Sequence, residues 1–417
     1  MLTTLANAWK LPELRKKMIF TMLMFAVFRF GAHVPVPGLI PDLLSQMFTS
    51  DLFNFVDILS GGSFKNLTVF AMGIIPYINA SIIIQLLTMV VPFFEKLAKE
   101  GNEGRKKMTQ YTRYGAVGLG LMQALVMSFY LRSAMINPNA WSIMVCTITL
   151  TAGTAFLMWL GELITEHGIG NGISLIIFAG IASRLPAGVT TIISYVTTGE
   201  ANILSSLVML VVALAMVAGV VAVQEGQRRI PVQYAKRVVG RKVYGGQSTH
   251  IPMKINQAGV IPIIFSTAIL TFPTIIANFF PDVGFAAGIA RMMNYRHPLY
   301  VIINSLMIFF FTYFYTAATF NTADVADNMR KNGGFIPGLR PGRPTTEYLD
   351  KVLSRLTFSG ATFLTLIALM PSTFMAVSGM NLYFGGTSLL IAVGVALDTM
   401  KQIESHLLMR HYQGFMK

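Results

Sequence analysis

Long apolar segments recur along almost the whole chain, and they restrict its fold more than any other feature. A helix that spans the hydrocarbon core of a bilayer needs about 20 mostly apolar residues. Ten segments approach that requirement, at 18–35, 70–91, 114–131, 143–161, 173–190, 204–223, 258–279, 299–320, 356–376 and 384–400. Charged residues make up only 12% of the chain, about half the fraction usual in soluble proteins. The sequence therefore predicts an all-α polytopic membrane protein with ten transmembrane helices.

The distribution of basic residues predicts the orientation of these helices. With ten spans both chain ends face the same side, and 26 of the 32 Lys and Arg residues fall on that side. The other six are Arg29, Lys65, Arg132, Arg184, Arg291 and Arg296. Cytoplasmic loops of membrane proteins carry such an excess of Lys and Arg, so we expect both termini in the cytoplasm. This rule explains most of the net charge of +14, so the charge does not by itself indicate a nucleic-acid-binding protein.

Sequence signatures of enzyme chemistry are missing. The glycine-rich stretch GIGNGIS at 168–174 lacks the lysine of a phosphate-binding loop, and we interpret it as a tight turn before the fifth span. The six histidines show no metal-ligand spacing, and no nucleophile–base motif stands out. The single cysteine, Cys146, allows no internal disulfide and is expected to pack as a small hydrophobe. We therefore expect no cofactor and no enzymatic activity.

The spans also carry few ionisable residues at depth. Glu162, Glu225 and Asp398 lie near predicted cytoplasmic ends, and Arg29 can reach the opposite interface by snorkelling. Ion-coupled transporters usually keep carboxylates or histidines inside the bundle. This pattern argues against ion coupling, and less strongly against a solute transporter whose sites use only backbone carbonyls.

Two cytoplasmic loops are larger than a topological anchor requires. Loop 224–256 alternates weakly and is rich in β-branched and aromatic residues, which favours a twisted hairpin. Loop 322–355 has the Gly and Pro punctuation of a defined turn. Five spans fall in residues 1–195 and five in residues 196–417, so an inverted repeat of two five-helix halves is a hypothesis.

The stretch ILSGGSFKNLTVFAMGIIPYINASIIIQLL at 58–87 joins a polar, glycine-rich half to an apolar half. Pro76 removes one hydrogen bond of a helix, and Gly73 loosens the same turn. Broken helices at membrane depth survive only inside protein or beside an aqueous cavity. We therefore expect residues 58–69 to form a short re-entrant segment within a funnel.

Isoleucine pairs follow both the re-entrant segment and the GIGNG turn. Ile74 and Ile78 share one helical face, as do Ile173 and Ile177. Such pairs usually face lipid or pack against neighbouring helices, and only their setting favours a pore. Three amides, Gln85, Gln123 and Asn256, are expected near the cytoplasmic half of the bundle. Amides of this kind either hold helices together, at about 0.6 kcal/mol per contact, or act in gating.

Several ordered motifs resemble the SecY family of protein-translocation channels over essentially the whole chain. They are FRFGAHVPVPG (28–38), GIIPYINASIIIQLL (73–87), EGRKKMTQYTRYG (103–115), MWLGELITEHGIGNGISLIIFAGI (158–181), GQRRIPVQYAKR (226–237), QSTHIPMKINQAGVIP (247–262), GFIPGLRPG (334–342) and YFGGTSLLI (383–391). The resemblance implies an hourglass pore that passes unfolded secretory polypeptides. It also implies a lateral gate that releases signal sequences and membrane segments into lipid.

The resemblance assigns roles to particular residues. The pore ring of the family matches Ile74, Ile78, Ile173, Ile177, Ile264 and Ile391. The plug matches about 52–70, with Ser60, Gly61, Gly62, Ser63, Phe64, Lys65 and Asn66 at its centre. The lateral gate matches Gln85, Gln123 and Asn256, flanked by Asn79 and Phe272. A ring of branched apolar side chains excludes water and ions when empty, yet it can deform around a passing chain.

The resemblance also implies partners. Arg228, Arg229 and Arg340 match the surface on which the family docks the ribosome or a SecA-type motor ATPase. The other partners implied are SecE-like and SecG-like small membrane subunits, signal-sequence-bearing polypeptide clients and anionic phospholipids, in a bacterial cytoplasmic membrane. A small-solute secondary transporter is the alternative, and a membrane insertase without a through-pore is a third hypothesis. A solute carrier would need neither of the two large basic loops.

Overall fold

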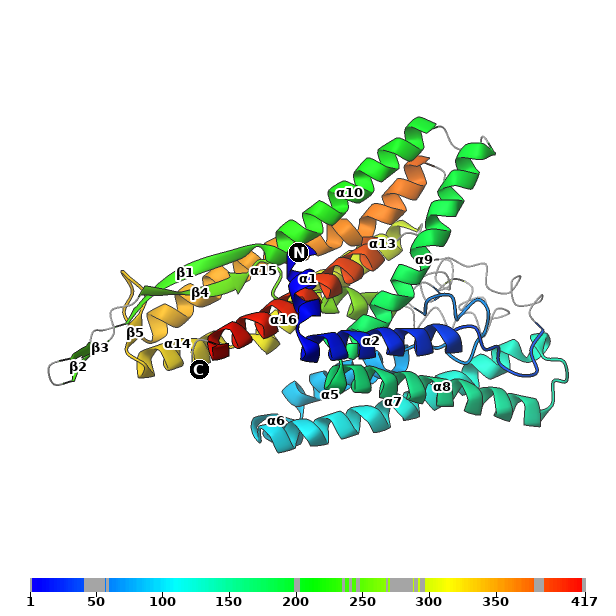
Figure 1. Cartoon of the computed structure of the whole chain (residues 1–417), viewed down its shortest axis with the longest axis horizontal. Coiled ribbons are helices and arrows are strands. Elements are labelled where there is room, and N and C mark those ends of the chain that lie inside the picture. Colours follow the sequence, from blue (N-terminus) through cyan, green and yellow to red (C-terminus); the bar gives the residue numbers. More distant parts are fainter. Residues whose placement is uncertain are drawn as a thin grey trace.

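The computed structural model shows a helical bundle with a β-sheet projecting from one end (Figure 1). It describes residues 2–40, 57, 60–198, 203–234, 237–239, 242–244, 248–267, 269–270, 288, 292, 297–378 and 386–414. Helices from the N-terminal part of the chain form one arm of the bundle, and helices from the C-terminal part form a second arm (Figure 1). Helices α9 and α16 pack together where the arms meet.

The first arm is built from the N-terminal helices. They are α1 (Leu2–Lys10), α2 (Pro12–Gly31), α5 (Ile75–Val90), α6 (Pro92–Lys99), α7 (Asn102–Tyr130), the 3₁₀ helix η1 (Leu131–Ala134), α8 (Ala140–His167) and α9 (Gly172–Thr197). Helix α7 packs against α5 and α8, and α8 packs against α2 and α9. Phe28, Leu157, Leu160 and Ile164 fill the space between α2 and α8 and are at most 2% exposed.

The second arm carries the remaining helices and the strands. They are α10 (Ile203–Glu225), β1 (Gln227–Tyr234), β2 (Arg237–Val239), β3 (Lys242–Tyr244), β4 (Ser248–Lys254), α13 (Pro298–Thr319), α14 (Thr322–Lys331), β5 (Gly334–Phe335), α15 (Arg343–Ser378) and α16 (Gly386–Gly414). Residues 261–267 are also helical. Val220, Ile263, Ile308, Leu364 and Leu390 form the apolar core of this arm.

Helix length and composition support a multi-pass membrane protein. Within the described part of the chain, five segments are long and apolar enough to cross a membrane: Asn102–Ala134, Ala140–His167, Gly172–Thr191, Pro298–Lys331 and Arg343–Met370. Helices α5 and α6 count as a sixth if their 99° bend is one broken span. Large apolar side chains point outward, including Phe30 at 77% and Trp141 at 72% exposure. The ten predicted spans are consistent with this arrangement.

The sheet at one end confirms the hairpin predicted within 224–256. Strand β1 pairs antiparallel with β4, from Gln227 opposite Lys254 to Gln233 opposite Ser248. It also pairs with β5, which gives the order β4–β1–β5, and β2 pairs with β3 as a second hairpin. Ile230 and Val232 alternate inward and pack against residues of α14 and α15. The sheet is therefore anchored to the helical bundle by its own apolar face.

The expectation that Pro76 interrupts a helix was wrong in detail. Pro76 lies in the first turn of α5, which begins at Ile75, so the proline starts this helix and does not break it. Proline is tolerated there because its missing N–H would have no helical partner. Arg29 Nη1 donates to the Gly61 carbonyl at 3.0 Å, and its reach to the membrane interface stays a prediction. The burial of Cys146 among apolar residues confirms its predicted packing role.

Candidate pore and plug

The start of α5 positions the first isoleucine pair. Gly73 has a φ of +57°, a left-handed conformation that glycine adopts without strain, and it turns the chain into the helix. The Ile78 amide then donates to the Ile74 carbonyl at 3.0 Å, which closes the first helical turn. Ile74 and Ile78 are therefore held on one side of α5 by the backbone.

The GIGNG turn positions the second pair, as predicted. Gly170 has a φ of +87°. The Asn171 Oδ1 accepts hydrogen bonds from the amides of Ile173 and Ser174 at 3.1 and 3.2 Å, so Asn171 caps α9. A Cβ on Gly172 would overlap the Gly161 carbonyl of α8, so only glycine allows the two helices to approach this closely. The Asn171 cap and the close contact of Gly172 with Gly161 together fix where Ile173 and Ile177 enter the bundle.

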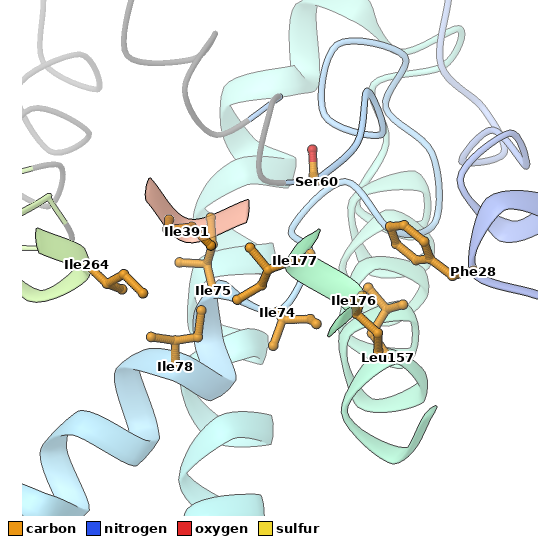
Figure 2. A pocket seen from close by; sticks show the side chains of 11 residues that line it. Phe28, Ser60, Ile74, Ile75, Ile78, Leu157, Ile176, Ile177, Ile264 and Ile391 are labelled. Atoms are coloured by element: carbon orange, nitrogen blue, oxygen red, sulfur yellow. The ribbon is translucent and has the colours of Figure 1, made fainter. Parts of the chain in front are cut away.

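The predicted ring residues meet around one narrow cavity of about 20 Å³ (Figure 2). Its lining includes Ile74 just before α5, Ile78 from α5, Ile177 from α9, Ile264 and Ile391. Ile173 is not part of the lining, but it packs in the same apolar cluster as Ile177 and Ile391. A volume of this size leaves room for about one water molecule, and the lining is almost wholly apolar. The arrangement is a constriction closed by hydrocarbon side chains.

Sequence reasoning missed four members of this lining. Ile75, Ile176, Leu157 and Phe28 contribute side chains to the same cavity (Figure 2). Ile75 and Ile176 each adjoin a predicted ring residue, so their apolar character was visible in the sequence. Their approach to the cavity depends on how α5 and α9 are placed by the rest of the bundle, which no periodic pattern records.

The described plug residues fold against neighbouring helices, among them α9. Residues 60–74 form consecutive turns, and Ser60 lines the cavity (Figure 2). Gly61 and Gly62 have φ values of +67° and +94°. A Cβ on Gly61 would lie 2.9 Å from the Gly180 Cα of α9, so this glycine lets the plug touch that helix. Residues 52–56, 58 and 59 of the predicted plug lie outside the described residues.

The other predicted plug residues differ in exposure. Ser63 and Phe64 are 0% and 7% exposed, whereas Lys65 and Asn66 are exposed. Asp57, which we did not predict as a site residue, forms a salt bridge with Arg184 of α9. An acidic residue in an apolar stretch is a recognisable signal for a paired site. The sequence alone did not identify its partner.

The predicted lateral-gate amides do not form a hydrogen-bonded cluster in this structure. The Asn256 side chain is buried, and its Nδ2 donates to the Gly259 carbonyl at 3.0 Å, while its Oδ1 has no partner. No hydrogen bond joins Asn256 to Gln85 or Gln123, all three of which the structure describes. Asn79, Gln85 and Gln123 are half-buried on α5 and α7. Phe272 lies outside the described residues.

The three predicted docking arginines are exposed at the sheet. Arg228 and Arg229 lie on β1, and Arg340 follows β5, the strand that pairs with β1. The Arg340 carbonyl accepts from the Thr345 hydroxyl at 2.8 Å, which fixes the backbone of its loop. The described residues include no group of three or more His, Cys, Asp or Glu side chains able to hold a metal ion. The expected absence of a cofactor stays a prediction.

Comparison with known sequences identifies the family. The SecY family model matches residues 68–400. The protein translocase subunit SecY of Halalkalibacterium halodurans is 48% identical over all of both chains. That of Thermotoga maritima is 45% identical, over 99% of this chain and 97% of its own. The chain belongs to the SecY family. The ring, plug, gate and docking roles of individual residues remain predictions from the motifs of this family.

Solved structures show the same fold at low sequence identity. A structure described as that of a protein conducting channel aligns with a TM-score of 0.66 and 17% identity, over 96% of each chain. A SecY structure, described in terms of a plug domain that stabilises the closed state, aligns at 0.65 with 17% identity, over 96% of each chain. Canine Sec61 in a ribosome–channel complex aligns at 0.63 with 16% identity, over 96% of each chain. The fold of this SecY-family chain is therefore that of the SecY and Sec61 channels.

Proposed function

We propose that the chain is the channel-forming subunit of a protein translocase. It would pass unfolded secretory polypeptides across a membrane and release signal sequences and membrane segments sideways into lipid. The observation that carries this proposal is the isoleucine-lined constriction, set in a SecY-family fold with membrane-length helices. A small-solute transporter is not favoured, because the relatives over the full chain are translocase subunits.

The constriction supports a mechanism in which the channel is sealed against ions but does not select among polypeptide sequences. An empty ring of branched apolar side chains disfavours water, so ions do not cross it. No fixed polar group in the ring recognises a particular sequence, and the side chains can rearrange around whatever residue passes. We propose that Ile74, Ile78, Ile173, Ile177, Ile264 and Ile391 form this seal. Residues of about 52–70 would act as a plug beside it.

The lateral gate is proposed between α5 and α7 on one side and the helices that follow Asn256 on the other. Asn79, Gln85, Gln123, Asn256 and Phe272 would line it. Because the three amides lack mutual hydrogen bonds in this structure, their contribution to closure would come from packing and from contacts with the signal helix. The two halves of the channel would be residues 1–195 and 196–417.

The exposed sheet supports a docking function on the cytoplasmic side. Arg228, Arg229 and Arg340 present guanidinium groups that bind phosphate or carboxylate bidentately. One proposed partner is the ribosome, whose RNA offers phosphates, and another is a SecA-type motor ATPase that supplies energy. Anionic phospholipids would compete for the same charges. SecE-like and SecG-like small subunits would complete the complex, in a bacterial cytoplasmic membrane with both termini inside.

A cross-linking experiment tests the pore directly. A precursor arrested during transport would be tested against channels carrying a photoreactive residue at Ile78 or, as a control, at Leu306. Leu306 is 64% exposed on the outside of α13. We expect the precursor to cross-link from position 78 and not from 306. Equal cross-linking from both positions, or cross-linking from 306 alone, would contradict a pore at the ring.

A further inference from the structure

The described part of the plug is tied to helix α9 by a charge pair that the apolar seal does not require. Asp57 is almost fully buried, and its side chain is 4% exposed. Its Oδ2 pairs with Nη2 of Arg184, which α9 supplies at 32% exposure. An isolated buried charge is costly, so each of these groups favours the position in which it meets the other.

The same carboxylate also organises the plug itself. The Asp57 Oδ1 accepts from the Lys65 amide at 2.8 Å, and the Asp57 carbonyl accepts from the Gly62 amide at 2.8 Å. One side chain therefore fixes the internal turn of the plug and joins it to α9. A movement of α9 that separates the pair would act on this turn, because the carboxylate that bonds Arg184 through one oxygen accepts from the Lys65 amide through the other.

The glycines of the plug make space for this pair. A Cβ on Gly62 would lie 2.8 Å from the Arg184 Nη2, so a larger residue would displace the guanidinium. Arg29 of α2 adds a second tie through its bond to the Gly61 carbonyl. The plug thus contacts α2 through a hydrogen bond and α9 through a salt bridge. Ser60, which belongs to the same segment, lines the cavity.

We propose that Asp57 and Arg184 form an electrostatic latch that holds the plug in its closed position against α9. This inference rests on the proposed channel function, and it makes both residues positioning residues for the plug. Opening of the channel must separate the pair, and it becomes favourable only when water or a moving chain solvates the two charges. The latch would hold the plug in place between transport events, while the isoleucine ring excludes water.

Labelling of the plug tests the latch. Ser63 is fully buried, and its Oγ has no hydrogen-bond partner, so Ser63→Cys provides a reporter that costs no hydrogen bond. The reporter would be placed in the purified, membrane-reconstituted complex and exposed to a membrane-impermeant maleimide. Asp57→Asn and Arg184→Gln should each raise the labelling rate by roughly tenfold or more, because each removes the charge pair that joins the plug to α9.

The double variant separates a latch from two independent contacts. Asp57→Asn with Arg184→Gln should label no faster than either single variant, since the second change removes nothing further. Arg184→Lys keeps the charge and should stay near the parent rate. The control Glu95→Gln makes a comparable change in an exposed pair with Lys99, at 2.7 Å, and should have no effect.

Unchanged labelling in both single variants, or rates that multiply in the double variant, would overturn the latch. Equal acceleration by Arg184→Lys and Arg184→Gln would also overturn it, because packing and not charge would then hold the plug. Precursor transport by the parent complex is measured in parallel. Its failure would contradict the proposed function, while the labelling rates still report the latch.

Discussion

Ile78 on α5 and Ile391 on α16, from opposite ends of the chain, line the same narrow cavity. Ile177 of α9 and Ile264 complete the contact between them, and Ile391 is only 3% exposed. Two arms of the bundle therefore meet through branched apolar side chains. A relative movement of the arms would widen this contact without breaking a hydrogen bond between them at the ring.

The ring predicts that smaller side chains will make the resting channel leak. Ile78→Gly combined with Ile177→Gly removes apolar contacts and enlarges the cavity, so water and ions can enter. We expect resting ion conductance in planar bilayers to rise by roughly tenfold or more. Ile83→Gly, on the same helix but 44% exposed, is the matched control and should leave conductance unchanged. A resting current equal to wild type in the double variant would refute this placement of the ring.

The docking surface predicts a charge-specific defect. Arg340→Glu replaces a donor of charge-assisted hydrogen bonds, each worth about 1.5–3 kcal/mol, by a repelling group. Motor-driven transport should fall by about tenfold or more, while the amount of channel inserted in the membrane stays constant. Arg343→Glu is the control, since Arg343 is highly exposed and pairs with Glu347 on its own helix. Parallel loss of transport and insertion in Arg340→Glu would indicate misfolding instead.

The glycine contact between plug and α9 predicts a position-specific effect. Gly61→Ala forces alanine into a left-handed conformation, at about 1–2 kcal/mol, and places its Cβ against Gly180. Gly38→Ala has the same backbone strain, with a φ of +85°, but meets no atom within 4 Å. Only Gly61→Ala should increase ion leakage through the resting channel. Similar leakage in both variants would show that strain, and not contact with α9, determines plug position.

The packing of α8 on the plug segment predicts a stability difference. A Cβ on Gly153 would overlap the Val69 carbonyl, and such overpacking costs about 1–3 kcal/mol. Gly153→Ala should therefore lower the thermal unfolding midpoint in detergent. Gly118→Ala on α7 meets no atom within 4 Å and should be neutral or raise stability by up to about 1 kcal/mol. Equal midpoints for the two variants would contradict the close contact.

Local features of the sequence predicted much of this architecture. The spacing of Ile173 and Ile177 and the GIGNG turn gave the correct start of α9, because a capping side chain and a helical period act over a few residues. A hairpin within 224–256 was predicted by weak alternation together with β-branched and aromatic residues, but the sequence did not show that β4 is the strand that pairs with β1. The misplaced role of Pro76 has a local cause too: hydropathy does not mark where a helix begins within an apolar run.

Contacts between distant segments could not be predicted. Arg184 was visible as a lone basic residue in the fifth span, and Asp57 as an acid in an apolar stretch. Which partner each one meets depends on how the plug folds back on α9. The same holds for the contact of Gly61 with Gly180.

Transport by a purified complex would show whether the protein conducts polypeptides. Proteoliposomes would contain this chain with its small membrane partners, and receive a SecA-type motor, ATP and a precursor with a signal sequence. We expect the precursor to become protected from external protease, and this protection to require both ATP and the signal sequence. Absence of protection, in a folded complex with an active motor, would contradict a polypeptide-conducting channel.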